Sequence, residues 1–358
     1  MWKWAIGGGT AFGPDHTTAC ACLQSFGTQP PAKRAAGIPV QGGYRLAGSA
    51  AEAARGQPDR PNPPAHDAFT RLLTRLEPDP DTPWTEAQPQ VQRDDGVRVV
   101  DDSTLDEPYA RSIERVTRHG SGKHRAVVRG INLVSRLWTD GDRHIPCDDR
   151  VYDTADARTK NDHFADMIRI ASARGFAPRC VAFDGWYSSL DTLKLIRNCG
   201  WVGCTRLKSN RLVNLSRQGT RALAETVISA TGTEVWLPGF GLVKVFGIAT
   251  PNGGTAYGAT NDLSMTDLTR LQFAEFSWAI ENYHRGIKQC TGVERCQCRK
   301  AQAQRNHIGL ALRAFLRFEA HCFAKGISWV EAKTAIIRDA VRAYLARPQI
   351  CFPRLQTA

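Results

Sequence analysis

The stretch VRVVDDST, residues 97–104, combines a buried-strand pattern with two consecutive acids. Its first half has the composition of a buried strand, and its second half begins with the consecutive acids Asp101 and Asp102. A second strand-like run, RCVAFD at 179–184, also ends on an acid, Asp184. We therefore predict two strands that each present a carboxylate where the strand leaves its sheet.

The elements around these two strands follow an α/β order. Strand patterns flank the turn Thr139–Asp142, which predicts an antiparallel hairpin. Helical spacing predicts a helix at 160–175, and a capping box at Ser188 and Asp191 predicts the start of a second helix. The apolar run at 201–207 predicts a further strand. The predicted elements are, in order, strands at 97–100, 126–138 and 143–153, a helix at 160–175, a strand at 179–184, a helix beginning at Ser188, and a strand at 201–207.

The remaining parts of the chain have a different character. Residues 208–267 contain short β-prone runs separated by Gly and Pro, which predicts a β-rich insertion. A long helix is predicted from Asp267 to Lys288, followed by helices at about 302–324 and 328–346. A short amphipathic helix is predicted just after His66. The sequence thus predicts an α/β core, interrupted by an insertion and followed by helices.

The helix predicted at 267–288 has two distinct faces. Glu281 and Arg285 have the spacing of an ordinary i, i+4 ion pair on its polar face. With acids at the ends of two strands, however, Glu281 can also complete a set of three carboxylates, which is typical of a two-metal site. The apolar stripe consists of Phe273, Phe276, Ile280, Tyr283 and Ile287, and the polar face of Trp278, Glu281, Arg285 and Lys288.

The charge balance of the chain favours a polyanionic partner. The 358 residues include 47 Lys+Arg and 35 Asp+Glu, which gives a net charge of +12. Residues 282–347 alone hold 13 Lys+Arg and four Asp+Glu, so we expect the polyanion to lie against the C-terminal third. Two Mg²⁺ or Mn²⁺ ions about 3.5–4 Å apart, held by carboxylates, could activate a water or a 3′-hydroxyl against the phosphodiesters of such a partner.

Several other classes of protein are disfavoured. No apolar run approaches the ~18 residues of a membrane helix, and the N-terminus lacks a signal-peptide core, so we expect a cytoplasmic protein with no membrane partner. The 11 cysteines lack CxxC spacing, and both Cys20–Cys22 and Cys296–Cys298 are closer than structural zinc sites require. We expect reduced thiols.

Residues 1–65 hold ten Gly and eight Pro, which is typical of low-complexity or disordered sequence.

Five sequence blocks resemble, in the right order, those of bacterial insertion-sequence DDE transposases, in the group named after insertion sequence four. They are VVDDSTLDEPYA, TKNDHFADM, VAFDGWYSSLDTLKLIRNCGW, TRLKSNRLV and WAIENYHRGIKQ, within residues 66–347. The resemblance implies an RNase H-like mixed sheet flanked by helices, interrupted by a β-rich insertion and followed by a helical C-terminal extension. It also implies cut-and-paste DNA transposition with two Mg²⁺ or Mn²⁺ ions.

The resemblance also implies roles for individual residues. The catalytic and metal-binding acids are Asp102, Asp184 and Glu281, with Asp101 as the alternative first acid, because both aspartates fit the family's acid-x-hydroxyl pattern. The residues expected to bind DNA are Arg285, Lys288, Lys208, Asn210, Arg211 and Trp278.

The group's Tyr-x2-Arg-x3-Glu-x6-Lys signature is only half present. Glu281 and Lys288 have the right separation, whereas Ala274 and Ser277 stand where the Tyr and Arg are expected. Arg285 is therefore the candidate to substitute for the missing phosphate contacts.

The implied organisation is a series of five segments. These are a low-complexity segment at 1–65 that is disordered or mistranslated, the remnant of a helical N-terminal module at 66–95, the first part of the RNase H-like catalytic core at 96–207, the β-rich insertion at 208–267, and the last core helix with the C-terminal helices at 268–350.

The implied partners are double-stranded DNA, as transposon inverted-repeat ends and as target, and a second copy of the chain in the DNA complex. The expected location is the bacterial cytoplasm, at the nucleoid. Three functions remain open: an active metal-dependent transposase, a catalytically inactive DNA-binding remnant, and an RNase H-like nuclease without transposition.

Overall fold

The computed structural model describes residues 67–121, 126–215 and 219–347. These residues fall into two compact units, and each is described by itself. The sheet unit comprises the described residues of Asp81–Ala110 and Val116–His284, and the helical unit comprises residues 67–80, Arg111–Arg115 and residues 285–347. The predictions for residues 1–65 and for Cys20 and Cys22 lie outside the described residues.

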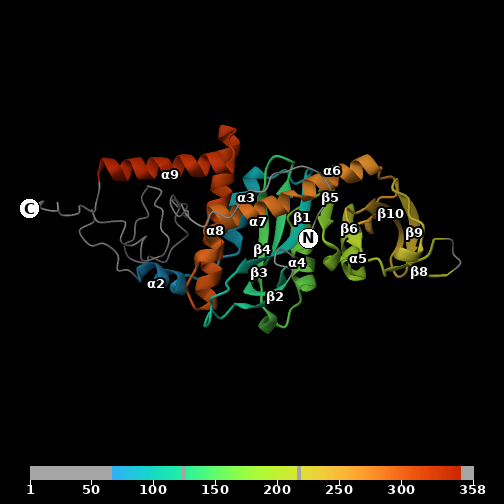
Figure 1. The fold of residues 1–358 in the computed structure, drawn as a ribbon, viewed down its shortest axis with the longest axis horizontal. Helices are drawn as coiled ribbons and strands as arrows, with labels where there is room; N and C mark the ends of the chain where they lie inside the picture. Colours follow the sequence, from blue (N-terminus) through green and yellow to red (C-terminus); the bar gives the residue numbers. More distant parts are fainter. Residues whose placement is uncertain (1–66, 122–125, 216–218, 348–358) are drawn as a thin grey trace, which may run out of the picture. The chain divides into compact units, whose positions relative to one another are not determined.

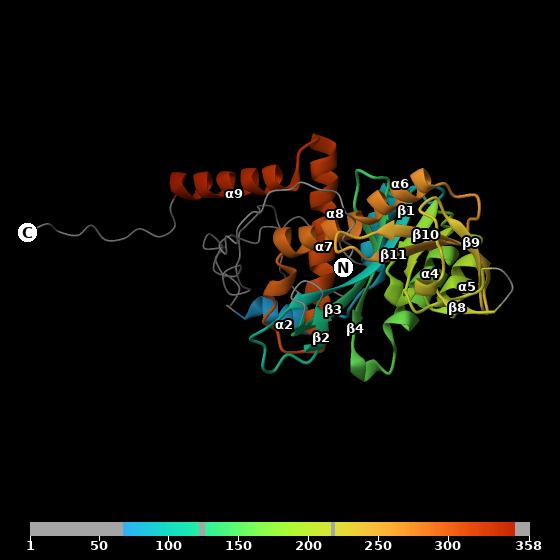
Figure 2. The same cartoon turned by 45° about the vertical axis from the view of Figure 1, so that its right-hand side comes forward.

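The sheet unit is built on one mixed sheet of nine strands (Figures 1 and 2). Eight strands form the path β2-β3-β1-β5-β6-β11-β10-β9, and β4 pairs with β3. In chain order they are β1 (Val97–Asp106), β2 (Thr117–Ser121), β3 (Ala126–Thr139), β4 (Ile145–Tyr152), β5 (Cys180–Phe183), β6 (Gly203–Leu207), β9 (Thr233–Leu237), β10 (Gly241–Ala249) and β11 (Thr255–Thr260). Two short strands, β7 (Leu212–Val213) and β8 (Arg221–Ala222), pair separately.

The order β4-β3-β1-β5-β6 is the RNase H-like arrangement. The pairs β1–β3 and β3–β4 are antiparallel, whereas β5 runs parallel to both β1 and β6. Three strands of the β-rich segment 208–267, β9–β11, extend the same sheet, because β11 pairs with β6. Strands β7 and β8 of this segment pair apart from it. The predicted fold class, a mixed sheet with flanking helices and a helical C-terminal region, is confirmed.

Strand β1 is longer than the sequence predicts. It continues to Asp106 because it pairs with β3 over its whole length, so that Asp101 and Asp102 lie inside the strand. On its other edge, pairing with β5 ends at Val100 and Phe183. The two acids therefore lie where the parallel ladder stops and the antiparallel ladder continues.

Helices lie against both faces of this sheet. They are α3 (Asp81–Ala87), α4 (Lys160–Ala173), α5 (Leu190–Asn198), α6 (Asp267–Ser277) and α7 (Ala279–Cys290). Phe164 of α4 packs against Phe183 of β5 and stacks on Tyr187, with ring centroids 5.3 and 5.1 Å away. All three rings are fully buried.

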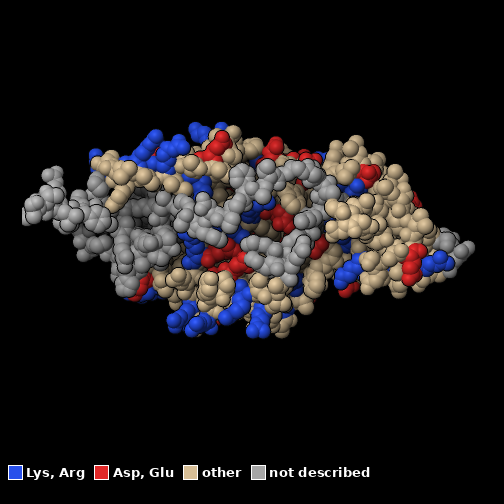
Figure 3. All heavy atoms as spheres, in the orientation of Figure 1, with Lys and Arg blue, Asp and Glu red and all other residues tan. Residues whose placement is uncertain are grey.

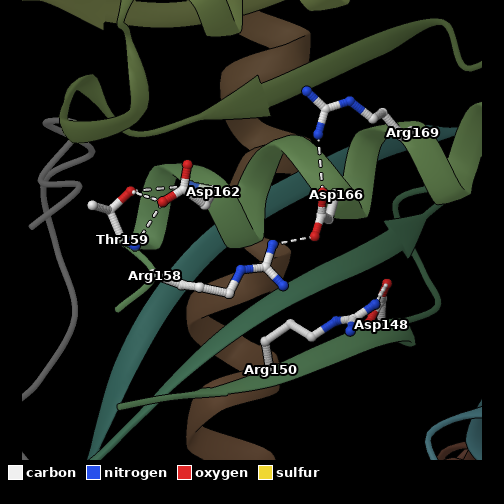
Figure 4. A network of polar contacts seen from close by, with 7 residues as sticks. All are labelled: Asp148, Arg150, Arg158, Thr159, Asp162, Asp166 and Arg169. Atoms are coloured by element: carbon white, nitrogen blue, oxygen red, sulfur yellow. Dashed lines mark hydrogen bonds and ion pairs between the residues drawn. The ribbon is translucent and has the colours of Figure 1, made fainter. Parts of the chain in front are cut away.

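Helix α4 begins with a dense set of polar contacts (Figure 4). Thr159 and Asp162 form a reciprocal capping box, which fixes the helix start at Lys160. Asp166 accepts from Arg158 and, at 2.9 Å, from Arg169, while Arg150 pairs with Asp148 on neighbouring β4 at 2.8 Å.

The capping box predicted for α5 is wrong by one residue. Its cap is Ser189, whose hydroxyl accepts from the Thr192 amide, because Ser188 instead donates to the Gly185 carbonyl.

The single long helix predicted at 267–288 is also wrong, because α6 and α7 are separate. The Trp278 amide donates to the Glu275 carbonyl at 3.0 Å, and the Glu281 amide to the Trp278 carbonyl at 3.1 Å. These i to i−3 bonds tighten the backbone at the junction. The apolar stripe nevertheless behaves as predicted. Phe273, Ile280, Tyr283 and Ile287 are buried, and Phe276 is half-buried.

The helical unit contains α2 (Ala68–Arg75), α8 (Ala301–Lys325) and α9 (Trp329–Ala346), close to the predicted helices. Asn306 of α8 donates to the carbonyls of Leu73 and Leu76, both at 2.7 Å, which ties α8 to the end of α2. The Trp329 indole of α9 donates to Glu319 of α8 at 2.5 Å. None of the helices within the described ranges has the length and apolar character needed to cross a membrane.

Candidate functional site

The candidate site lies where the parallel pairing of β1 and β5 stops. Val100 and Phe183 are the last residues in register, so Asp101, still on β1, and Asp184, just after β5, each follow the last pair. The end of the ladder thus brings Asp101 and Asp184 close together although they are far apart in the sequence.

Glu281, in the first turn of α7, belongs to the same charged group. The pKa of Asp101 is raised well above its usual range, first by burial and then by the negative charges of Asp102, Asp184 and Glu281. The amide of Asp102 donates to the Asp101 carboxylate at 2.8 Å, which offsets only part of that repulsion. The structure therefore brings Asp101 electrostatically together with the two acids that the sequence places on β5 and the late helix.

A hydrogen-bonded trio anchors α7 over the Asp101 face of the sheet. Tyr283, two residues after Glu281, donates to Asp149 of β4 at 3.1 Å, and Ser135 of β3 donates to the same oxygen at 2.5 Å. Ser135 is the cross-strand partner of Asp101, so the anchor and the acid share one face of the sheet. Burial raises the pKa of Asp149 to about 7. Sequence reasoning missed this trio, because Tyr283 reads only as part of an apolar stripe.

Asp102 points to the opposite face, where three donors surround its carboxylate. Tyr187 donates to one oxygen at 2.8 Å, while Lys160 and Asn132 donate to the other at 2.7 and 2.8 Å. Although burial acts to raise it, the pKa of Asp102 is lowered by the Lys160 ammonium and by these hydrogen bonds. The resemblance implied Asp102 as the first acid, with Asp101 as the alternative. In the structure, Asp101 faces the other acids and Asp102 is neutralised by a cation.

Asp184 has its own local partners. Its carboxylate accepts from the Gly185 amide at 2.7 Å and caps the short turn Gly185–Tyr187. The neighbouring cation is Arg206 of β6, whose pKa burial lowers and the Asp184 charge raises. Lys160 and Arg206 both lie inside the five sequence blocks. No spacing in the sequence points to their acidic partners, which are 58 and 22 positions away.

The three acids suit a hard divalent cation, because carboxylate oxygens are the ligands that Mg²⁺ and Mn²⁺ prefer. The positive charge of a bound ion would also relieve the repulsion between the carboxylates. Within residues 67–121, 126–215 and 219–347, however, no group of three or more His, Cys, Asp or Glu side chains has an arrangement that could hold an ion. The residues thus fit a metal by chemistry, and their side chains would have to reorient to coordinate one.

The residues predicted to bind DNA lie in both units. In the sheet unit, Lys208 and Asn210 are exposed, Arg211 is half-buried, and Trp278 is 38% exposed. The ammonium of Lys208 lies 5.8 Å from the ring centre of Trp186, an indole that is 63% exposed directly after the Asp184–Gly185 turn. The sequence did not single out this exposed indole as a contact.

Two further predicted DNA ligands belong to the helical unit. Arg285 is exposed, whereas Lys288 forms an ion pair with Glu294 at 3.4 Å. Lys and Arg side chains also gather along α9 on the face shown in Figure 3. This helix carries Lys333, Arg338 and Arg342 against Glu331 and Asp339.

Comparison with known proteins gives only remote structural likenesses. No protein-family model matches the chain, and no curated protein matches it. Among solved structures, the chain is similar to a piggyBac transposase, seen in a cryo-EM structure of its synaptic complex with hairpin DNA. The TM-score is 0.42 and the sequence identity 11%, over 80% of this chain. The match covers 66% of the piggyBac chain, less than two thirds of its length.

Proposed function

We propose that the chain is a metal-dependent DNA transposase, of the kind encoded by bacterial insertion sequences of the group named after insertion sequence four. The observation that carries the proposal is the charge coupling of Asp101 with Asp184 and Glu281. Asp101 lies on β1, Asp184 directly follows β5, and Glu281 is in the first turn of α7, and carboxylates whose charges act on one another are costly unless they serve a site.

In this proposal the first acid is Asp101 and not Asp102. The carboxylate of Asp102 already has an ammonium and two further hydrogen-bond donors, so it has little reason to bind a cation. Asp101 has no comparable compensation, since the charges that act on it are negative. Asp101, Asp184 and Glu281 would hold two Mg²⁺ or Mn²⁺ ions, which when bound supply an activated water or 3′-hydroxyl and stabilise a leaving oxygen of a phosphodiester.

The protein's own residues have supporting tasks. The bond from Tyr283 to Asp149 holds α7 against the sheet and so keeps Glu281 near Asp101. Exposed Trp186 and Lys208, next to Asp184, offer a stacking surface and a cation to a DNA strand at the site. Double-stranded DNA, as transposon ends and target, is the proposed substrate, and a second copy of the chain is the proposed partner in the complex.

A non-catalytic DNA-binding protein is the second candidate. It is favoured by one observation, that the described acids do not form a group ready to hold an ion. Such a protein would bind the same DNA through its basic residues and would not cut it.

A cleavage assay separates the two candidates. The full chain is incubated with Mn²⁺ and labelled DNA carrying the inverted repeats that flank its gene, beside the variants Asp101→Asn, Asp184→Asn and Glu281→Gln. We expect each variant to lose more than ~100-fold in cleavage rate while still binding DNA. Asp166→Asn, which alters a surface ion pair on α4, is the matched control and should cut normally. Binding without cleavage by the parent protein would favour the second candidate.

A further inference from the structure

Two cysteine thiols lie side by side in the segment before α8. Neither Cys296 nor Cys298 is in a disulfide. Cys296 is 5% exposed and Cys298 is half-buried, so Cys298 is the more accessible of the two residues. The thiol of Cys296 donates a hydrogen bond to the sulfur of Cys298. The two thiols therefore lie within hydrogen-bonding reach of each other, on one buried and one half-buried residue.

Two donors favour the ionised form of the accessible sulfur. The hydrogen bond from Cys296 outweighs the effect of burial and, with a weaker bond from the Thr70 hydroxyl of α2, lowers the pKa of Cys298 to about 7. A thiolate is the nucleophilic form of cysteine, so Cys298 is the member of the pair that reacts first.

The backbone around the pair is held in place on both sides. The side-chain amide of Gln304 donates to the carbonyl oxygens of Cys296 and Cys298, at 3.1 and 2.6 Å. Just beyond, the Glu114 amide donates to the Arg299 carbonyl at 3.0 Å, and the Glu114 carboxylate accepts from the Ala301 amide at 2.8 Å. All these residues belong to the helical unit. The segment is fixed with its two sulfurs together, which lowers the entropy cost of joining them.

We propose that Cys296 and Cys298 form a reversible dithiol–disulfide pair that reacts with small disulfides such as oxidised glutathione. The Cys298 thiolate attacks one sulfur of the small disulfide, whose S–S bond breaks and releases one thiolate, which takes up a proton. Cys296 then gives its proton to solvent and attacks the Cys298 sulfur, and the mixed disulfide breaks to release the second thiol. Two protein thiols are oxidised by two electrons, and the small disulfide is reduced to two thiols.

The reaction rate of Cys298 with an alkylating reagent follows from its ionised fraction and its nucleophilicity. At pH 7 a thiol with a pKa of about 7 is roughly half ionised, against ~3% for a free cysteine, which is a gain of about 15-fold. Lower basicity reduces the nucleophilicity of the thiolate about fivefold. Cys298 should therefore react with iodoacetamide roughly threefold faster in the parent protein than in Cys296→Ala, where the main donor is gone.

The test uses the full chain treated with oxidised glutathione at pH 7 and then digested with trypsin. Cleavage after Arg295 and Arg299 releases both cysteines in one peptide, residues 296–299. We expect this peptide to be lighter by two hydrogens and to resist alkylation. In Cys296→Ala the reaction should stop at glutathione bound to Cys298. The control Cys322→Ala, at a buried cysteine of the same unit, should behave as the parent.

Thr70→Val provides a second variant, which keeps both cysteines and removes only the weaker donor, and it should slow alkylation of Cys298. The proposal is overturned if peptide 296–299 is recovered with both cysteines alkylated after oxidation. It is equally overturned if alkylation of Cys298 proceeds at the parent rate in both Cys296→Ala and Thr70→Val.

Discussion

At the scale of residues, neighbouring side chains on one strand have opposite electrostatic roles. Asp101 and Asp102 are adjacent on β1 and therefore point to opposite faces of the sheet. One meets two other acids, and the other meets a lysine, an asparagine and a tyrosine. The sequence predicts the acids but not this division, because Lys160 lies 58 positions from Asp102 and only the folded sheet brings them together.

The first prediction concerns the metal-free stability of the Asp101 site. The folded pKa of Asp101 is raised, so the native state holds this proton more tightly than the unfolded chain does, and stability is lost as pH rises above about 4. Asp101→Asn removes the buried charge. At pH 8 in chelator, this should increase the unfolding free energy by on the order of 1 kcal/mol and so raise the melting temperature.

The matched comparison for that prediction is Asp102→Asn. This variant loses a charge that is paired with Lys160, so it should lower the melting temperature under the same conditions. Calorimetry of both proteins provides the measurement. A lower melting temperature for Asp101→Asn than for the parent protein would show that its carboxylate is not the repelled one.

The second prediction uses Asp149, whose folded pKa is about 7 against about 4 in an unfolded chain. Its contribution to stability is present below pH 4 and is lost progressively up to pH 7, by at most a few kcal/mol. Asp149→Asn keeps the oxygen that accepts from Ser135 and Tyr283 but cannot ionise. Melting temperatures measured from pH 5 to 8 should fall less steeply for the variant. Parallel curves would contradict the assignment.

At the scale of elements, most of the strands and helices were readable from the sequence, because periodicity and turn residues act locally. The hairpin of β3 and β4, helix α4 and helices α8 and α9 lie close to their predicted positions. The break at Trp278 was not readable, because it depends on backbone hydrogen bonds that tighten between α6 and α7 and not on Gly or Pro. The extension of β1 to Asp106 likewise depends on β3, a partner more than 20 residues away.

The third prediction concerns the anchoring of α7. Tyr283→Phe removes the donor to Asp149 and should cost about 1 kcal/mol in unfolding free energy. If this bond positions Glu281, the variant should also need a higher Mn²⁺ concentration for half-maximal cleavage, with less change in the rate at saturating metal. Tyr257→Phe, at a buried tyrosine of β11, is the control and should leave the metal requirement as in the parent. An unchanged metal requirement in Tyr283→Phe would remove its positioning role.

At the scale of the whole molecule, the positive charge is unevenly distributed along the chain. Residues 282–347, nearly all in the helical unit, carry 13 Lys+Arg against four Asp+Glu, whereas the three acids of the candidate site belong to the sheet unit. Binding and cleavage should therefore be separable by mutation, since phosphate contacts and metal ligands come from different side chains.

The fourth prediction is that DNA affinity falls steeply with salt, with a log–log slope of about −0.9 for each neutralised phosphate. Arg285→Ala should flatten this slope by about one unit, because the side chain is exposed. Lys288→Ala should do the same only if DNA displaces the ion pair with Glu294. Arg169→Ala, on α4, is the control. Salt titrations by fluorescence anisotropy would refute the assignment if the Arg285 variant kept the parent slope.

Convergence of Asp101, Asp184 and Glu281 on bound metal can be tested without any DNA cleavage. Fe²⁺ is substituted for Mg²⁺ in the purified protein, and hydroxyl radicals generated at the ion cut the polypeptide chain nearby. We predict cuts close to all three positions, 101, 184 and 281, which disappear in Asp101→Asn and persist in Asp102→Asn. Cuts at only one of the three positions, or cuts that persist in Asp101→Asn, would show that the three carboxylates do not share a metal site.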